Sequence, residues 1–342
     1  MNISHDYCII FPMVTLKEVA NAVGCSPSTV SVVLNGKAEQ RKISEKTKNK
    51  IIETASQMGY RVNMAARRLR AQQSANMIIS MFVAMDQRAY STTRFMLGLQ
   101  KAAEKSKQAL EIVVHFYKPG LLSELTQTIE YSNCAIVCDA SEEDLKFLEA
   151  SRFSNPLVLY CRDSEQYCTV NVNYALIGEM VADIFASHGH KRAVLLDTDT
   201  NIAGIKQCAE RFIEKSKEHG MTVTKINESH NMLGGYNGGF AIGLMHSSLD
   251  CIFSLNDAMS IGVLRALNEQ NIKIPDQLEL ISVGTDNPEL TEYANVPLST
   301  IHVPIEDMAE QCLNLLFQQL DNPKPQAIEL QIEYIPRESC GE

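Results

Sequence analysis

Residues Val14 to Gly36 read VTLKEVANAVGCSPSTVSVVLNG, and this stretch decides how the first part of the chain folds. Its apolar side chains recur at i, i+3, i+4 and i+7, which is one face of a helix: Leu16, Val19, Ala20 and Val23. Gly24 follows, and glycine readily adopts the left-handed conformation that ends a helix in a sharp turn. The pattern therefore predicts a short amphipathic helix that ends at Gly24.

A second helix is predicted directly after this turn. Ser26 can cap its first backbone amides, and Pro27 suits its first turn. Val30 and Leu34 are expected to face inward. Short hydroxyl side chains remain outside, where they can reach phosphates and base edges: Ser28, Thr29 and Ser31. The pair is typical of a helix-turn-helix in a DNA major groove, although an ordinary helical hairpin in a core has the same pattern.

The same stretch resembles the N-terminal module of the LacI/GalR family of bacterial repressors. The resemblance rests on VTLKEVA, on the G-x-S turn and on S-x-x-T-V-S-x-V-L-N-G. It continues in HGHKRAVLL, in Asn256-Asp257 followed by GVLRALNEQNIKIPDQLELISVGTD, and in the terminal Pro-Arg-Glu-Ser. It runs from residue 14 to 339, and it is strong at both ends and weak between about 85 and 135.

Charge is distributed unevenly along the chain. Residues 13–70 contain eleven Lys and Arg against four Glu, a balance of +7. Because the net charge is −10, the remaining residues carry −17. A basic head on an acidic body fits a module that neutralises phosphates and is joined to a body that does not.

Composition places the chain among globular proteins that do not span a membrane. Its 342 residues are enough for two or three compact units, and 45% are hydrophobic. No run approaches the roughly 18 consecutive apolar residues of a membrane helix. Residues 1–12 lack the features of a signal peptide and are interpreted as an N-terminal extension. The ten cysteines form no CxxC pair, so we expect buried or free thiols in a reducing cytoplasm.

A third helix and a hinge complete the head. Ser44 is expected to cap the third helix, whose apolar stripe comprises Ile51, Ile52, Ala55 and Met58. The helix-turn-helix domain is thus assigned to residues 13–61, and the hinge helix and linker to 62–74. The resemblance implies that the hinge forms when two protomers meet on DNA, with Leu69 wedged into the minor groove and arginines beside phosphates. A plain linker is the alternative.

From Ala75 onward, short apolar runs alternate with helical segments. MIISMFVAM, LEIVVHFY, NCAIVC and PLVLYC form a first series, and TVNVN, RAVLLDT, TVTKI, CIFSL and ELISVGT a second. Such alternation predicts an α/β fold with two doubly wound parallel sheets, similar to periplasmic binding proteins. We assign residues 75–163 and 293–324 to the N-subdomain of the core, and residues 164–292 and 325–342 to the C-subdomain. A ligand cleft is expected at the carboxyl ends of the strands.

The resemblance also implies an effector in this cleft, a carbohydrate or related metabolite. Six residues are expected to bind it: Tyr90, Arg94, Arg162, Cys208, Asp257 and Asp286. Asp257 is also placed to cap the helix that follows it. Cys208 occupies a slot where the family often has arginine, Cys161 one where it often has aspartate, and Leu233-Gly234-Gly235 one where it often has an aromatic residue. These losses weaken the case for an ordinary sugar.

The recognition helix departs from the family as well. The family commonly has a guanine-reading arginine where this chain has Val32, which can make only apolar contacts such as one with a thymine methyl. The full set of residues predicted to bind DNA is Thr15, Ser26, Pro27, Ser28, Thr29, Ser31, Val32, Asn35, Lys42, Asn63, Arg67 and Leu69.

The sequence therefore predicts a homodimeric transcriptional regulator, a repressor of a double-stranded operator controlled by a small-molecule effector. A protein co-regulator, or no small-molecule effector, is the alternative. A solute-binding receptor would not need residues 14–70, and no catalytic motif supports an enzyme. No cofactor is expected. His188 and His190 suggest a metal site, but with no third ligand nearby in the sequence we interpret them as surface-loop residues.

Overall fold

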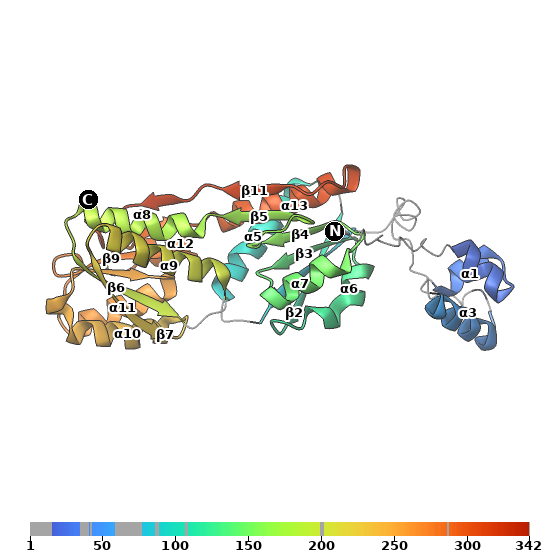
Figure 1. The fold of residues 1–342 in the computed structure, drawn as a ribbon, viewed down its shortest axis with the longest axis horizontal. Coiled ribbons are helices and arrows are strands. Elements are labelled where there is room, and N and C mark those ends of the chain that lie inside the picture. The colour runs from blue at the N-terminus through green and yellow to red at the C-terminus, as the bar shows by residue number, and fades with distance from the viewer. Residues whose placement is uncertain are drawn as a thin grey trace, which may run out of the picture. The chain divides into compact units, whose positions relative to one another are not determined.

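The computed structural model describes residues 16–34, 41, 43–58, 77–85, 89–106, 109–198, 202–285 and 287–341. The chain divides into two units, Met1–Ser74 and Ala75–Glu342. The described residues of the first unit include the helices α1, α2 and α3, and the second unit, called here the core unit, contains two sheets and their helices (Figure 1).

The helices of the first unit form around a small apolar core. They are α1 (Leu16–Val23), α2 (Pro27–Leu34) and α3 (Glu45–Gln57). Seven side chains are buried between them: Val19, Ala20, Val23, Val30, Val33, Ile51 and Ala55. Leu34 packs against this core but is only partly buried, whereas its neighbour Val33 is 4% exposed. One expectation needs correction: Ile52, placed in the apolar stripe of α3, is 46% exposed, whereas Ile51 beside it is buried.

The core unit begins with a six-stranded sheet whose strands are all parallel. The order is β11-β5-β4-β3-β1-β2. The strands are β1 (Met77–Ala84), β2 (Leu110–Tyr117), β3 (Cys134–Cys138), β4 (Leu157–Tyr160), β5 (Cys168–Val172) and β11 (Ala327–Leu330). The helices of this subdomain are α5 (Ala89–Lys105), η2 (Leu122–Leu125), α6 (Thr126–Tyr131), α7 (Glu142–Ser151) and α13 (Ile305–Asp321).

The second sheet has the order β12-β10-β9-β8-β6-β7 and is parallel except for the antiparallel edge strand β12. Its strands are β6 (Arg192–Thr198), β7 (Thr222–Glu228), β8 (Cys251–Ser254), β9 (Glu279–Gly284), β10 (Ser299–His302) and β12 (Glu333–Ile335). Its helices are α8 (Tyr174–Ser187), α9 (Ala203–Glu218), α10 (Met232–Leu244), η3 (His246–Ser248), α11 (Asp257–Glu269) and α12 (Pro288–Glu292). In the described part of the chain, no helix is long and apolar enough to cross a membrane.

The order of the strands shows where the chain crosses from one subdomain to the other. These crossings differ from the boundaries expected from the sequence, at 163/164, 292/293 and 324/325. Strand β5 bonds to β4 and belongs to the first sheet, as does β11, whereas β10 belongs to the second. The chain therefore crosses between Val172 and Tyr174, between His302 and Ile305, and between Leu330 and Glu333. Each crossing is only a few residues long, so the local sequence gives no sign of which sheet the next strand joins.

Candidate nucleic-acid interface and effector cleft

Helix α2 has one face in the core of the first unit and one face outside. Val30 and Val33 are 0% and 4% exposed. Ser28 is exposed, and Ser31 and Val32 are partly exposed. With 3.6 residues per turn, these three side chains lie on the face opposite the buried valines. The outer face thus offers two hydroxyls and one apolar group within a single turn.

The start of α2 is held by a cap. The Thr29 backbone amide donates to Ser26 Oγ at 3.1 Å, as expected from the sequence. The Ser26 hydroxyl also lies 2.8 Å from the hydroxyls of Ser28 and Thr29. Gly24, at φ +78°, makes the turn that precedes the cap. The first turn of α2 is therefore organised before it meets any ligand.

Helix α3 supports this arrangement from behind. Lys50 Nζ donates to the carbonyl oxygen of Val23 at 3.1 Å, which satisfies the last turn of α1. Ser44 accepts from the Thr47 amide at 3.3 Å and caps α3, as expected. The other residues predicted to bind DNA lie outside the described residues: Thr15, Asn35, Lys42, Asn63, Arg67 and Leu69.

A pocket of about 530 Å³, its open mouth included, lies between the two sheets of the core unit. Its lining comes from residues at or just after the carboxyl ends of strands and from the first turns of the helices that follow. The polar lining comprises Ser91, Asp139, Tyr160, Tyr174, His230 and Thr285, and the remainder comprises Ile202, Ile205, Cys208, Leu255, Val283 and Ile305. A concave, mainly apolar site with a few polar groups is the usual form of a small-molecule site.

Arg94 joins the two subdomains instead of lining this pocket. Its Nε and Nη2 donate to the Glu306 carboxylate at 2.9 and 2.5 Å. Its Nη1 donates to the carbonyl of Gly284 at 3.1 Å, and Nη2 donates to that of Val303 at 3.2 Å. The hydrogen bonds of the guanidinium thus go to α13, to the end of β9 and to the Val303 carbonyl between β10 and α13. Arg94 is only 4% exposed. The geometry supports a role in setting the junction and not in holding an effector.

Arg162 and Tyr90 are likewise not brought to the pocket lining. Arg162 is 9% exposed, and it donates to the Ala140 carbonyl and to Glu142 Oε1, the latter at 3.0 Å. Tyr90 lies on α5 with 46% of its surface exposed. Asp286 lies outside the described residues.

Asp257 has a different local role from the expected one. Asn256, and not Asp257, caps α11, because its side chain accepts from the Met259 amide at 2.7 Å. Asp257 is 1% exposed and accepts a hydrogen bond from Ser282 Oγ at 2.9 Å. This bond ties the start of α11 to β9, next to the pocket-lining strand ends.

Among the five expected effector residues that the structure describes, Cys208 alone lines the pocket. It is 1% exposed, and burial raises the pKa of its thiol well above the usual range, with Asp197 adding to the effect. Burial likewise raises the pKa of Tyr160. Sequence reasoning missed Asp139, Tyr174 and His230, although each comes shortly after a strand. The ligand cleft was expected at the carboxyl ends of the strands, and a search of the residues that follow each strand would have found all three.

Comparisons with known proteins agree with this architecture. Residues 15–63 match the family described as bacterial regulatory proteins, lacI family, and residues 182–340 match the periplasmic binding protein-like domain. The HTH-type transcriptional repressor PurR of Pasteurella multocida is 24% identical over 350 residues, covering 96% of this chain and 98% of that protein.

Solved structures share the fold. A LacI family transcription regulator from Clostridium acetobutylicum is 26% identical with a TM-score of 0.72, covering 76% of this chain and 99% of its own. The transcriptional regulator CelR–cellobiose complex is 18% identical with a TM-score of 0.67, covering 95% and 99%. The relatives are named as transcriptional regulators and not as enzymes. With its lacI-type helix-turn-helix and its periplasmic-binding-protein-like core, the chain belongs to the LacI family of DNA-binding transcriptional regulators.

Proposed function

We propose that the protein is a repressor that binds a pseudo-palindromic operator as a homodimer and responds to a small molecule in the core cleft. The observation that carries the DNA part is the outer face of α2, where Ser28, Ser31 and Val32 lie opposite the buried valines. The hydroxyls can bond to phosphates or base edges, and Val32 can contact a thymine methyl. Thr15, Asn35, Lys42 and the hinge residues Asn63, Arg67 and Leu69 complete the proposed interface.

Selection of bound fragments from a random DNA library at two salt concentrations tests this proposal. We expect one enriched, two-fold-symmetric site that persists at the higher salt. In the matched variant Val32→Arg, one position per half-site should change towards guanine, since an arginine–guanine pair contributes about 1–3 kcal/mol of discrimination. Binding without an enriched sequence, in both proteins, would contradict an operator reader.

For the effector, we infer a neutral, hydroxyl-bearing molecule such as a carbohydrate. Six of the twelve lining residues bring polar groups to the pocket, among them Asp139, Tyr174 and His230. The guanidinium groups of Arg94 and Arg162 are engaged within the protein, which argues against an anionic ligand. CelR, whose fold this chain shares, was solved with cellobiose. Of the six residues expected from the sequence, we retain Cys208 and Asp286 as candidate contacts.

A thermal-shift screen with monosaccharides and disaccharides tests the cleft. A true effector should raise Tm in proportion to its binding and change the affinity for the selected operator. Asp139→Asn should reduce both responses while DNA binding without ligand stays unchanged. An effector response that survives Asp139→Asn would move the ligand elsewhere.

Control by a protein co-regulator, or without any small molecule, remains the second candidate. Six of the twelve described lining residues carry no hydrogen-bonding group other than a thiol, which is an apolar lining for a sugar site. If no ligand in the screen binds and operator affinity changes only when cell extract is added, this second candidate is favoured.

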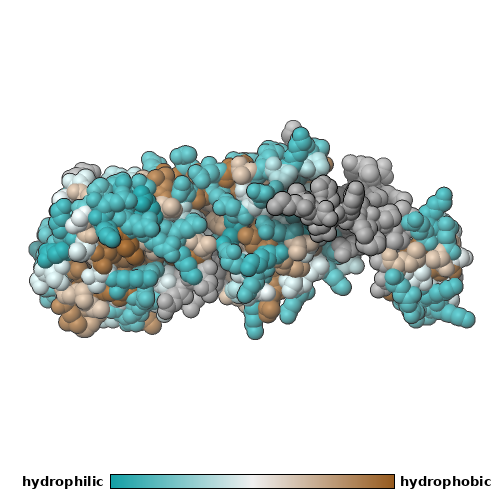
Figure 2. Space-filling view, viewed as in Figure 1, coloured by the Kyte–Doolittle hydropathy of each residue, from teal (hydrophilic) through white to brown (hydrophobic). Residues whose placement is uncertain are grey.

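The dimer is argued from helix α10. Its inner face carries buried glycines, of which Gly235 and Gly239 approach α11. Its outer face exposes Leu233, Phe240 and Leu244, at 68%, 48% and 76%. These three positions, i, i+7 and i+11, fall on one stripe. Figure 2 shows the visible face of the core unit as mainly hydrophilic, with separate hydrophobic patches. A helix that is apolar on both faces is normally covered on both, so we propose that a second copy covers this stripe.

A further inference from the structure

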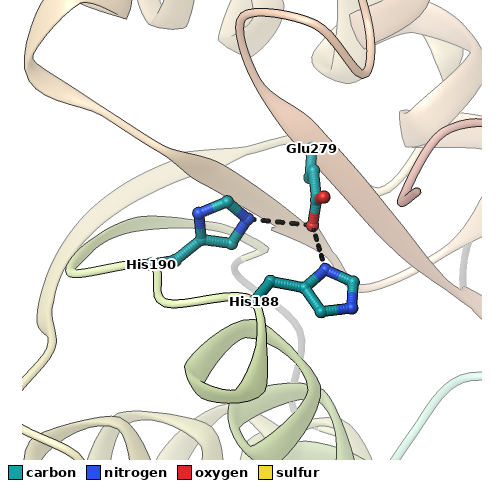
Figure 3. Close-up of side chains that lie close together, drawn as sticks. All are labelled: His188, His190 and Glu279. Atoms are coloured by element: carbon teal, nitrogen blue, oxygen red, sulfur yellow. Dashed lines mark hydrogen bonds and ion pairs between the residues drawn. The ribbon is translucent and has the colours of Figure 1, made fainter. Parts of the chain in front are cut away.

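Three segments far apart in the sequence meet at the amino ends of the strands of the second sheet. His188 and His190 lie in the loop after α8, and Glu279 is the first residue of β9. His188 Nδ1 and His190 Nε2 each lie 2.8 Å from Glu279 Oε2 (Figure 3). The sequence shows no third ligand near the two histidines, but the fold brings one to them, since Glu279 follows them by about 90 residues in the chain and cannot be found by spacing.

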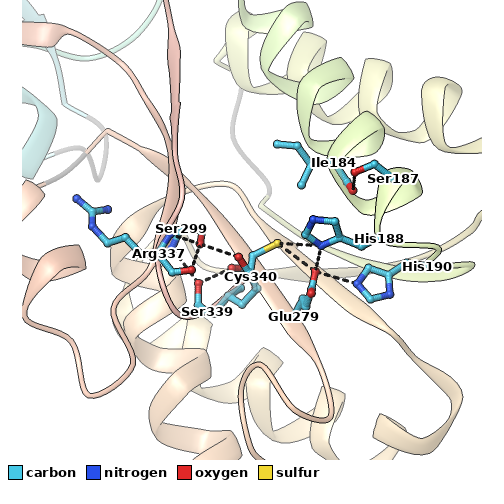
Figure 4. Close-up of polar contacts among 10 residues, drawn as sticks. Ile184, Ser187, His188, His190, Glu279, Ser299, Arg337, Ser339 and Cys340 are labelled. Carbon is cyan, nitrogen blue, oxygen red and sulfur yellow. Dashed lines mark hydrogen bonds and ion pairs between the residues drawn. The ribbon is translucent and has the colours of Figure 1, made fainter. Parts of the chain in front are cut away.

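A cysteine completes the group. Cys340, in the C-terminal tail, is fully buried, and its Sγ lies 3.1 Å from Glu279 Oε2 and 3.9 Å from His188 Nδ1 (Figure 4). The tail is fixed in this position by its neighbour, since Ser339 Oγ donates to the Leu280 carbonyl at 2.6 Å and the Leu280 amide donates to the Ser339 carbonyl at 2.7 Å. Cys340 is thus held against the start of β9 by backbone pairing.

The four side chains offer two imidazole nitrogens, one carboxylate oxygen and one sulfur, which are the ligand atoms that Zn²⁺ prefers. In a tetrahedral zinc site, bond lengths of about 2.0–2.3 Å separate neighbouring ligand atoms by roughly 3.3–3.6 Å. The four separations given above, 2.8–3.9 Å, lie on both sides of that range. The ligand atoms of His188, His190 and Glu279 all lie within 4.8 Å of one another, so small side-chain movements would let these three share an ion and bring the Cys340 sulfur to it as the fourth ligand. We propose that His188, His190, Glu279 and Cys340 bind one Zn²⁺ ion.

The position of this zinc site separates it from the effector cleft. His190 precedes β6 and Glu279 begins β9, whereas the pocket lies at the carboxyl ends of the same parallel strands. Four protein ligands leave no open position, which is the pattern of a structural zinc site and not a catalytic one. Bound zinc would tie the C-terminal tail to the loop before β6 and so stabilise the second subdomain.

Zinc binding to the full-length, untagged protein tests the proposal. We expect one ion per chain and a rise in Tm on addition of Zn²⁺. His188→Ala is the first variant, because this imidazole is 30% exposed and its removal should leave the fold intact. Its zinc dissociation constant should rise at least tenfold. The matched control is His219→Ala, a histidine of the same subdomain that is 35% exposed and bonded to Asp183 at 2.6 Å, and it should bind zinc as the wild type does.

Cobalt substitution provides a second readout that reports the sulfur ligand. Co²⁺ in the wild-type site should show a thiolate-to-metal charge-transfer band and the strong visible bands of a tetrahedral ion. Cys340→Ser should lose the charge-transfer band, whereas Cys134→Ser, a buried cysteine of β3 in the other sheet, should keep it. Wild-type protein that retains no zinc would show a hydrogen-bond network only and overturn the site. Unchanged affinity in His188→Ala, or an equal loss in His219→Ala, would overturn it as well.

Discussion

Arg94 shows how one side chain can fix the relation between the two halves of the core unit. Its guanidinium bonds to Glu306 and to two backbone carbonyls, at Gly284 and Val303. Arg94→Ala would leave the partly buried Glu306 carboxylate without its charged partner and would remove one of the donors to each carbonyl, so we expect a loss of about 2 kcal/mol in the free energy of unfolding. Urea unfolding of the purified protein measures this.

The control for Arg94 is Lys105→Ala. Lys105 and Glu310 form an ion pair of 2.7 Å between the same two helices, α5 and α13, but the lysine side chain is 66% exposed. Exposed pairs contribute about 0–1 kcal/mol, so this variant should remain close to wild type. Equal losses in the two variants would mean that helix pairing, and not the junction carbonyls, explains the effect.

Also at the residue scale, we predict that the stabilising hydrogen bonds of Asp250 weaken in acid. Burial would raise the pKa of its carboxyl, but hydrogen bonds from the Arg192 side chain and from the Lys191 and Arg192 amides lower it below the ordinary 3.8. A carboxyl whose pKa is lower in the folded protein than in the unfolded chain stabilises the fold at pH values above its pKa in the unfolded chain. This stabilisation is lost as the pH falls through the pKa of the folded state. Asp250→Asn should therefore be less stable than wild type at pH 7, and the difference should shrink below about pH 4.

Thermal unfolding across this pH range checks the Asp250 prediction. Asp321→Asn, at the exposed end of α13, is the control and should stay within about 0.5 kcal/mol of wild type at every pH. A stability difference for Asp250→Asn that is constant from pH 7 to pH 3 would show that the lost bonds, and not the charge, matter.

At the scale of elements, α10 and α11 depend on glycine for their close approach. A Cβ at Gly235 would lie 2.0 Å from the Met259 carbonyl oxygen, a backbone atom that cannot give way. For a Cβ at Gly243 the three nearest atoms all belong to the end of the Gln270 side chain, which can rotate aside. Gly235→Ala should therefore cost about 1–3 kcal/mol or more, whereas Gly243→Ala should be neutral or stabilising by up to about 1 kcal/mol. Denaturant unfolding of both variants distinguishes these outcomes, and an equal response would disprove close packing at Gly235.

The elements also show where sequence reasoning succeeds and where it stops. The periodicity of α1 and the cap at Ser26 are local signals, and the structure confirms both. The sheet that β5 joins depends on hydrogen bonds to β4, and no local pattern encodes such a partner. The guanidinium of Arg94 could bind an effector, and the sequence cannot show that it binds Glu306 instead, because tertiary contacts decide its partner. For the same reason, the sequence alone did not indicate that Glu279 lies beside His188 and His190.

At the scale of the whole molecule, dimerisation and DNA binding should be linked. Leu244→Glu places a charge in the exposed stripe of α10 without touching the glycine face, so it should shift the protein towards monomer. Because a two-fold-symmetric operator is read by two heads, a monomer should make about half the phosphate contacts. Each lost contact reduces the slope of log affinity against log salt by about 0.9.

Light scattering for the oligomeric state and fluorescence anisotropy at several salt concentrations measure both effects on one sample. The control is Phe116→Glu on β2, an exposed aromatic residue of the first sheet that lies at 62% exposure and should leave the dimer and the salt slope unchanged. Dissociation by Phe116→Glu with an intact dimer in Leu244→Glu would place the interface on the first subdomain. A monomeric Leu244→Glu protein that keeps the full salt slope would instead mean that each head binds DNA independently, and the link between dimer and operator would be lost.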